Sequence, residues 1–254
     1  MAKKLKEYYD AEYIENLSDK IQRVYPDFNR GIFIELVAKD IDKLEFGQRQ
    51  LLIAESLKEV LDLDYPQSIE IFTKILGPEL PSNIGMFTEG YWLWPIGKFV
   101  EIYGLNDFTD SMNFIKELTK RHTGEFAIRP FVKEYPEETI AVLTQWSKDP
   151  SQNVRRLSSE AMRIRLPWAK KLYTALEYFP EYRKILENLK GDPDKSVQKS
   201  VANNLNDLYR EEEEKFNEII EDWSQKPSKE CAWIIKHGSR TKRKEENRIE
   251  RIKA

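Results

Sequence analysis

A repeated unit of helix and proline constrains the fold of this chain more than any other feature. The segment WSKDPSQNVRRLSSE (146–160) aligns with LKGDPDKSVQKSVAN (189–203) and with WSQKPSKECAWIIKH (223–237). The offsets are 43 and 34 residues, and Pro150, Pro193 and Pro227 fall in register. Units of two helices at such a period are typical of α-solenoids. We predict an all-α fold, an α-solenoid of HEAT-like helical repeats that is curved, with a basic concave face.

The remaining sequence also favours helices, because apolar residues recur at helical spacing and breaks rich in Pro, Gly or Asp separate the segments. No segment alternates like a strand over more than a few residues. We expect a single domain over 1–254, with 1–10 and 242–254 flexible, a long loop at 76–90, and Pro130 kinking or interrupting the helix at 123–135. The expected helices are 11–24, 29–42, 47–61, 66–76, 91–104, 107–122, 123–135, 136–149, 151–164, 169–178, 180–192, 194–210, 213–226 and 228–240.

Composition narrows the class of protein. One third of the residues are charged and Gly is scarce, which suits a helical protein. A single cysteine, Cys231, excludes an internal disulfide, and with only two histidines a structural zinc site is not expected. The sequence shows no signal-peptide core and no run of membrane-spanning length. We expect a cytoplasmic monomer that binds no membrane, metal or organic cofactor.

The helix expected at 151–164 carries the first candidate site. Val154, Leu157, Ala161 and Ile164 form one apolar stripe, while Arg156, Glu160 and Arg163 share the other face. One interpretation is a set of ion pairs on a solvated face. The other is a functional carboxylate, set between two guanidinium groups and followed by Trp168.

Charge is distributed unevenly along the chain. The formal net charge is −3, yet residues 151–171 carry six Lys and Arg against one acid, with Arg155 and Arg165 among them. In the repeat alignment, Arg156, Glu160 and Arg163 correspond first to Lys199, Asn203 and Asn206, and then to Trp233, His237 and Arg240. Equivalent second helices of a solenoid line one surface. These aligned, mostly cationic or amide side chains form a row along that surface. The row predicts contacts to a phosphate backbone, with a solvated helix face as the alternative.

The strings LTKRHTGEFAIRPFV, DPSQNVRRLSSEAMRIRLPW, SVQKSVANNLNDL and WIIKHG, together with the upstream WLWPIGKFVEIYG, resemble the AlkC branch of the AlkC/AlkD-type DNA glycosylases. The likeness covers about residues 85–241. It implies a monofunctional enzyme of base excision repair that removes N3-methyladenine and N3-methylcytosine from double-stranded DNA. Some members carry an immunoglobulin-like C-terminal domain, which is not expected in this sequence. Carried over position by position, the lesion-facing residues of the family fall on Glu125, Glu160, Trp168 and Asp207.

The chemistry suits these residue types. A base methylated at N3 is already cationic and leaves readily, so the energetic difficulty lies in the oxocarbenium character of the sugar. We expect Glu160 to stabilise this cation and orient water, with Glu125 and Asp207 adding negative potential. Trp168 would stack on the sugar or the lesion. Arg156, Arg163 and Lys199 would hold flanking phosphates.

Other interpretations remain for the residues taken one by one. Glu125 could be an acid in the first turn of a helix, Trp168 a buried anchor of its turn, and Asp207 a partner of Arg210. The whole chain could instead be a non-catalytic protein that binds damaged or branched DNA. A third alternative is a protein–protein scaffold, a common use of such folds.

Overall fold

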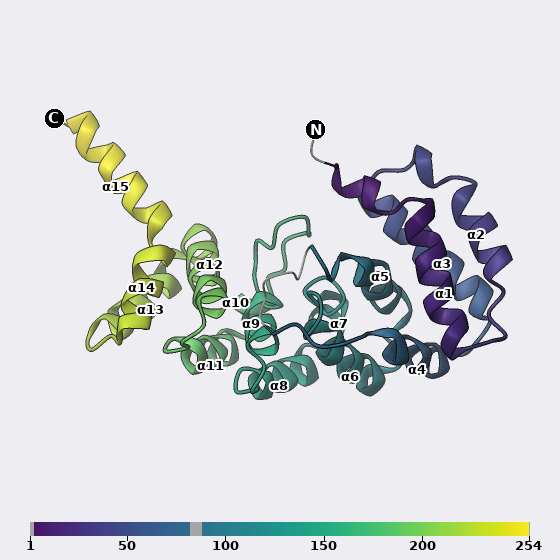
Figure 1. Cartoon of the computed structure of the whole chain (residues 1–254). Coiled ribbons are helices and arrows are strands. Elements are labelled where there is room, and N and C mark those ends of the chain that lie inside the picture. The colour runs from purple at the N-terminus through teal and green to yellow at the C-terminus, as the bar shows by residue number, and fades with distance from the viewer. Residues whose placement is uncertain (1–2, 82–87, 254) are drawn as a thin grey trace. The chain divides into compact units, whose positions relative to one another are not determined.

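A computed structural model describes residues 3–81 and 88–253 (Figure 1). Within these ranges the chain forms fifteen α-helices and three short 3-10 helices, and no strand, which confirms the all-α prediction. No helix there combines the length and the apolar character needed to cross a bilayer. The chain divides into two compact units, an N-terminal unit (residues 1–130) and a C-terminal unit (residues 131–254). Each unit is described by itself.

The N-terminal unit packs six α-helices around an aromatic core. Helices α1 and α2 pack together, α3 lies against α5, and α4 lies against α6. Phe72 contacts Phe99 edge to face, and both rings are fully buried. The elements are η1 (Leu5–Tyr8), α1 (Ala11–Val24), α2 (Arg30–Ala38), η2 (Ile41–Lys43), α3 (Phe46–Leu61), α4 (Tyr65–Ile75), η3 (Tyr91–Leu93), α5 (Trp94–Tyr103) and α6 (Phe108–Thr119).

The C-terminal unit contains the repeated helices. Helices α8, α11 and α13 are the first members of three pairs, and α9, α12 and α14 are the second members, with α12 packed between α9 and α14. Helix α15 continues from α14 and leads away from it (Figure 1). The elements are α7 (Arg129–Glu134), α8 (Pro136–Trp146), α9 (Gln152–Glu160), α10 (Thr174–Glu177), α11 (Phe179–Leu189), α12 (Lys195–Glu211), α13 (Glu213–Ser224), α14 (Lys229–Gly238) and α15 (Arg240–Lys253).

The aligned prolines lie in turns that start the second helices. Asp149 and Asp192 precede Pro150 and Pro193, and each accepts a hydrogen bond from the backbone N–H two residues later, at 2.8 and 2.9 Å. Such Asx turns reverse the chain locally. The third copy lacks this aspartate, and there Ser228 caps α14 by accepting from the N–H of Cys231. Cys231 itself is buried, and burial raises the pKa of its thiol.

Several expected helices differ from those observed. Helix α2 ends at Ala38, and the helix expected at 123–135 is reduced to α7, where Pro130 is the second residue and so helps to begin the helix instead of kinking it. Only 174–177 is helical within 169–178. The tail that was expected to be flexible is helical in α15 up to Lys253. Part of the loop expected at 76–90 lies outside the described residues.

Helix α9 also ends early, at Glu160 instead of Ile164. After Glu160 the backbone tightens, because the N–H groups of Met162 and Arg163 donate to carbonyls three residues back. The predicted apolar stripe nevertheless holds, since Val154, Leu157, Ala161 and Ile164 are all fully buried. The early end of the helix frees the following residues to form the loop that carries Trp168.

Candidate active site

Glu160 lies at the end of α9 in a buried polar network facing α12. One of its carboxylate oxygens accepts from Arg163 Nη1 at 2.8 Å and lies 3.7 Å from Arg156 Nη2. The other accepts from the Ser200 hydroxyl of α12 at 2.5 Å. Only 4% of Glu160 is exposed, so the alternative of ion pairs on a solvated face is wrong.

Glu160 keeps its negative charge in this environment. Burial alone would raise the pKa of its carboxyl, but the guanidinium groups of Arg156 and Arg163 and the Ser200 hydrogen bond outweigh it and hold that pKa below the usual value. Both carboxylate oxygens are already engaged. Glu160 is therefore suited to acting through its charge and position more than by accepting a proton.

Asp207 of α12 shares Arg163 with Glu160. Arg163 Nε donates to Asp207 Oδ2 at 3.0 Å, and the backbone N–H of Arg165 donates to the same oxygen at 3.3 Å. The alternative pairing with Arg210 is not what the structure shows, since Arg210 donates to Thr241. Burial raises the pKa of Asp207 in spite of Arg163, which lowers it. The two buried carboxylates are thus shifted in opposite directions, the pKa of Asp207 upward and the pKa of Glu160 downward.

The loop after α9 is held at both sides by carboxylates of α12. Arg163 and Arg165 bind Asp207 on one side. Arg165 also pairs with Glu211 at 2.5 Å, and Lys171 reaches the same carboxylate at 2.8 Å. A backbone hydrogen bond from Leu172 to Ile164, at 3.1 Å, closes the base of the loop. These contacts fix the position of the residues at its tip.

Trp168 occupies that tip in a strained backbone conformation. Its φ is +63°, a left-handed value that bulky residues rarely adopt. The N–H of Ala169 donates to the carbonyl of Leu166, which places Pro167 and Trp168 at the second and third positions of a turn, the arrangement of a type II turn in which the third residue is usually Gly. Trp168 is 73% exposed, so it is not a buried anchor. An exposed aromatic ring held at a backbone cost indicates a functional position.

Glu125 belongs to the N-terminal unit. It is buried, and one carboxylate oxygen accepts from the Thr123 hydroxyl at 2.9 Å. Residues 125–128 form turns and α7 begins only at Arg129, so Glu125 is not an acid in the first turn of a helix. Of the four predicted lesion-facing residues, the structure joins Glu160 and Asp207 through Arg163, and Trp168 lies in the loop that Asp207 and Glu211 hold.

The arginine side chains predicted to bind phosphates are less exposed than cations on a solvated helix face would be. Arg155 turns toward the next repeat and pairs with Asp192 at 2.6 Å, while Arg156, Arg163 and Arg165 join the carboxylates already described. Among the other predicted DNA-binding residues, Lys199 alone is exposed. Their assignment as DNA contacts stays a prediction.

The last members of the row contact one another or their neighbours. Arg240 donates to Asn203 at 3.0 Å, and Thr241 donates to Asn206 at 2.8 Å. His237 stacks on Trp233 with ring centroids 4.9 Å apart. The pKa of His237 is lowered by burial and by the nearby Arg240, Lys199 and Arg243, so this imidazole is mostly neutral at pH 7.

Sequence reasoning missed the polar stripe of α12. Ser200, Asn204, Asp207 and Glu211 follow one another at spacings of four, three and four, and so share one face of the helix. Ser200 and Asn204 are buried, and Asn204 donates to the carbonyl of Ser159 on α9. Helical spacing of small polar and acidic residues was the signal that could have revealed it.

Among the described residues, no group of three or more His, Cys, Asp or Glu side chains is arranged to hold a metal ion. Residues 122–244 match the family described as DNA alkylation repair enzyme. The uncharacterized protein YhaZ of Bacillus subtilis (strain 168) is 35% identical over 240 residues, which is 93% of this chain and 64% of YhaZ.

Among solved structures, the chain is similar to Pseudomonas fluorescens alkylpurine DNA glycosylase AlkC bound to DNA containing an abasic site analog. The TM-score is 0.84 at 34% identity, over 94% of this chain and 65% of that one. The chain thus spans just under two-thirds of the length of these two relatives.

Proposed function

We propose that this chain, which is similar to DNA alkylation repair enzymes of the AlkC type, is a DNA glycosylase acting on cationic alkylated bases in duplex DNA. Its substrates are N3-methyladenine and N3-methylcytosine. The observation that carries the proposal is the exposed Trp168, held in a strained turn of the loop whose Arg163 and Arg165 bind the buried Asp207. A π face next to negative charge suits a cationic base and the cationic sugar that forms as the base departs.

In the proposed reaction the N-glycosidic bond breaks with its electron pair, and the alkylated base leaves as a neutral molecule. Water then adds to the sugar carbon and gives up a proton. The ionised Glu160 supplies fixed charge for the oxocarbenium-like sugar. Asp207 accepts the proton from the water, since burial raises the pKa of its carboxyl. Trp168 stacks on the sugar or the lesion.

The cationic side chains have a separate role in this proposal. Lys199 and the Arg side chains around the site bind the phosphates that flank the lesion. The reaction needs no lysine nucleophile, so the enzyme is monofunctional and borohydride traps no covalent adduct with DNA. This chemistry needs no metal or organic cofactor. We expect the enzyme to act as a monomer in the cytoplasm.

The test is release of methylated bases from methylated duplex DNA by the purified protein. We expect release by the wild type and a loss of about 10²- to 10³-fold in Glu160→Gln and Asp207→Asn, the usual cost of removing one electrostatic group from an active site. Asp192→Asn is the matched control, because it removes a buried carboxylate that pairs with Arg155, outside this network. It should retain release if it stays folded.

Other outcomes are equally informative. Activity that survives in Glu160→Gln would move the main role to Glu125 or Asp207. A wild type that binds DNA yet releases no base would be a binding protein on a glycosylase fold. A wild type that binds no DNA would support the scaffold alternative and contradict the proposal.

A further inference from the structure

The last helix, α15, carries far more positive than negative charge. Its fourteen residues include seven Lys and Arg and three Glu. Lys244, Arg248 and Arg251 follow at spacings of four and three, so they share one side of the helix, which we call the basic face of α15. All three are exposed. Of the three Glu residues, Glu245 alone is three or four residues from one of these cations, Arg248, and it accepts a hydrogen bond from Tyr209 of α12.

The start of α15 is fixed to the helix that builds the candidate site. Arg240 and Thr241 bind Asn203 and Asn206 of α12, and Lys242 donates to Asn217 of α13 at 2.8 Å. Lys242 and Glu245 fall on a different side of the helix from the basic face at 244, 248 and 251, whereas Thr241 lies one turn before Lys244 on the same side. The contacts therefore hold α15 in place and leave its basic face exposed.

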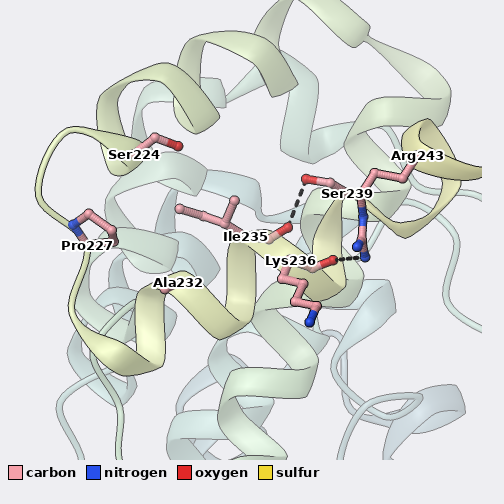
Figure 2. A pocket seen from close by; sticks show the side chains of 7 residues that line it. All are labelled: Ser224, Pro227, Ala232, Ile235, Lys236, Ser239 and Arg243. Carbon is pink, nitrogen blue, oxygen red and sulfur yellow. Dashed lines mark hydrogen bonds between the residues drawn. The ribbon is translucent and has the colours of Figure 1, made fainter. Parts of the chain in front are cut away.

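The corner between α14 and α15 adds further cations. Lys236, Ser239 and Arg243 line a pocket of about 350 Å³ with the apolar Ala232 and Ile235 (Figure 2). Arg243 donates back to the carbonyl of Lys236, which ties the first turn of α15 to α14. Positive charge thus continues from the end of α14 onto α15.

We propose that the basic face of α15 binds the phosphate backbone of the duplex that is the substrate in the proposed function. From Lys244 to Arg251 the helix rises about 10 Å, and each DNA strand carries one phosphate per about 3.4 Å of axis, so three side chains can reach about three phosphates. The anchor on α12 favours DNA over an anionic membrane, because α12 also supplies Asp207 and Glu211. Moreover, the exposed Ile249 and Ile252 are too few to form an apolar face for insertion into a bilayer.

The experiment measures binding of an unmodified 20-base-pair duplex to the whole chain at salt concentrations from 50 to 200 mM. The variant is Lys244→Gln/Arg248→Gln/Arg251→Gln, in which glutamine keeps the helix propensity. The matched control is Lys148→Gln/Lys184→Gln/Lys226→Gln, which removes three exposed cations at the first helices of the repeats. The same proteins are also tested on vesicles containing anionic lipid.

We expect the α15 variant to bind DNA about a hundredfold more weakly than the control at 50 mM salt. Its plot of log K against log salt should be shallower by two to three, because each lost phosphate contact removes about 0.9 from the slope. The gap between the two variants should narrow as salt rises. Equal slopes would overturn the inference, and so would a variant that loses only vesicle binding.

This inference rests on the proposed function, but the two can fail separately. A wild type that releases methylated bases while the α15 variant keeps the slope of the control refutes the inference alone. A wild type that binds DNA through α15 and releases no base refutes the glycosylase and leaves the inference standing.

Discussion

The two sides of α12 pack on their neighbours in opposite ways. Toward α9, Ser200 and Asn204 form a hydrogen-bonded interface with Ser159 and Glu160. Toward α14, the contact is apolar and very close, because a Cβ added at Gly238 would lie 2.9 Å from the Cβ of Leu205. Buried ionic networks are weak contributors to stability, whereas close apolar packing is a strong one. The polar interface therefore points to function, and the apolar interface points to support of the fold.

The largest expected effect comes from Arg163→Met, which leaves Glu160 and Asp207 buried without their shared partner. We expect a loss of about 3–5 kcal/mol in the free energy of unfolding at pH 7, measured by urea denaturation. Burial alone would raise the pKa of Glu160, and Arg156 and Arg163 hold it below its usual value. That stabilisation is present at neutral pH and disappears as the pH falls through the carboxyl range. The difference from the wild type should therefore shrink between pH 7 and pH 4.

A matched control for this change is Arg183→Met. Arg183 pairs with Glu187, Glu218 and Asp222 between α11 and α13, but those carboxylates are partly exposed. The control should lose about 1 kcal/mol or less. Equal losses of unfolding free energy in the two variants would show that the network of Glu160 and Asp207 contributes no more to stability than a surface cluster of ion pairs.

An intermediate effect is expected for Gly238→Ala at the apolar interface. The new Cβ would collide with the Cβ of Leu205 and lie 3.2 Å from the carbonyl oxygen of Ala202, atoms that cannot rotate away. Overpacking costs about 1–3 kcal/mol, and the better helix propensity of alanine offsets part of it. We expect a net loss of about 1–2 kcal/mol, with base release unchanged in the protein that remains folded.

The control for the Gly238→Ala variant is Gly191→Ala, because a Cβ added at Gly191 would meet no neighbouring atom within 4 Å. Its stability should stay within about 1 kcal/mol of the wild type. A Gly238→Ala protein as stable as this control would mean that α12 and α14 are packed less closely than the structure shows.

The smallest effect on stability, and the one of opposite sign, is expected for Trp168→Gly. Glycine adopts a positive φ without strain, so the variant should be more stable by up to about 1 kcal/mol in thermal unfolding. Base release should fall steeply, because the exposed ring is lost. Trp168→Phe, which keeps an aromatic face, should retain more activity than the glycine variant. A glycine variant as active as the wild type would remove Trp168 from the site.

Local sequence signals predicted the fold well. The aligned prolines and the apolar stripe of α9 correctly indicated paired helices, because the Asx turns and the helical periodicity depend on neighbours within a few residues. The end of α9 could not be predicted in this way. It depends on Arg163 reaching Asp207, which is 44 residues further along the chain.

The electrostatics of the site were harder to predict, for the same reason. Residues 151–171 look strongly basic in linear sequence, but Asp192, Asp207 and Glu211 are brought to them by folding. Likewise, the helical spacing of Arg156, Glu160 and Arg163 indicated that the carboxylate meets both guanidinium groups, yet it could not show that the carboxylate is buried. Burial depends on α12, whose polar stripe becomes meaningful only once it packs on α9.

The one thiol of the chain has a consequence for the proposed function, which is carried out amid alkylating damage. Electrophiles that methylate bases also react with cysteine, and they do so through the thiolate. Cys231 is covered by its own helix pair, and its raised pKa keeps it in the protonated form. The folded protein therefore offers these reagents almost no thiolate, and the proposed base release should persist after treatment that inactivates enzymes with accessible thiols.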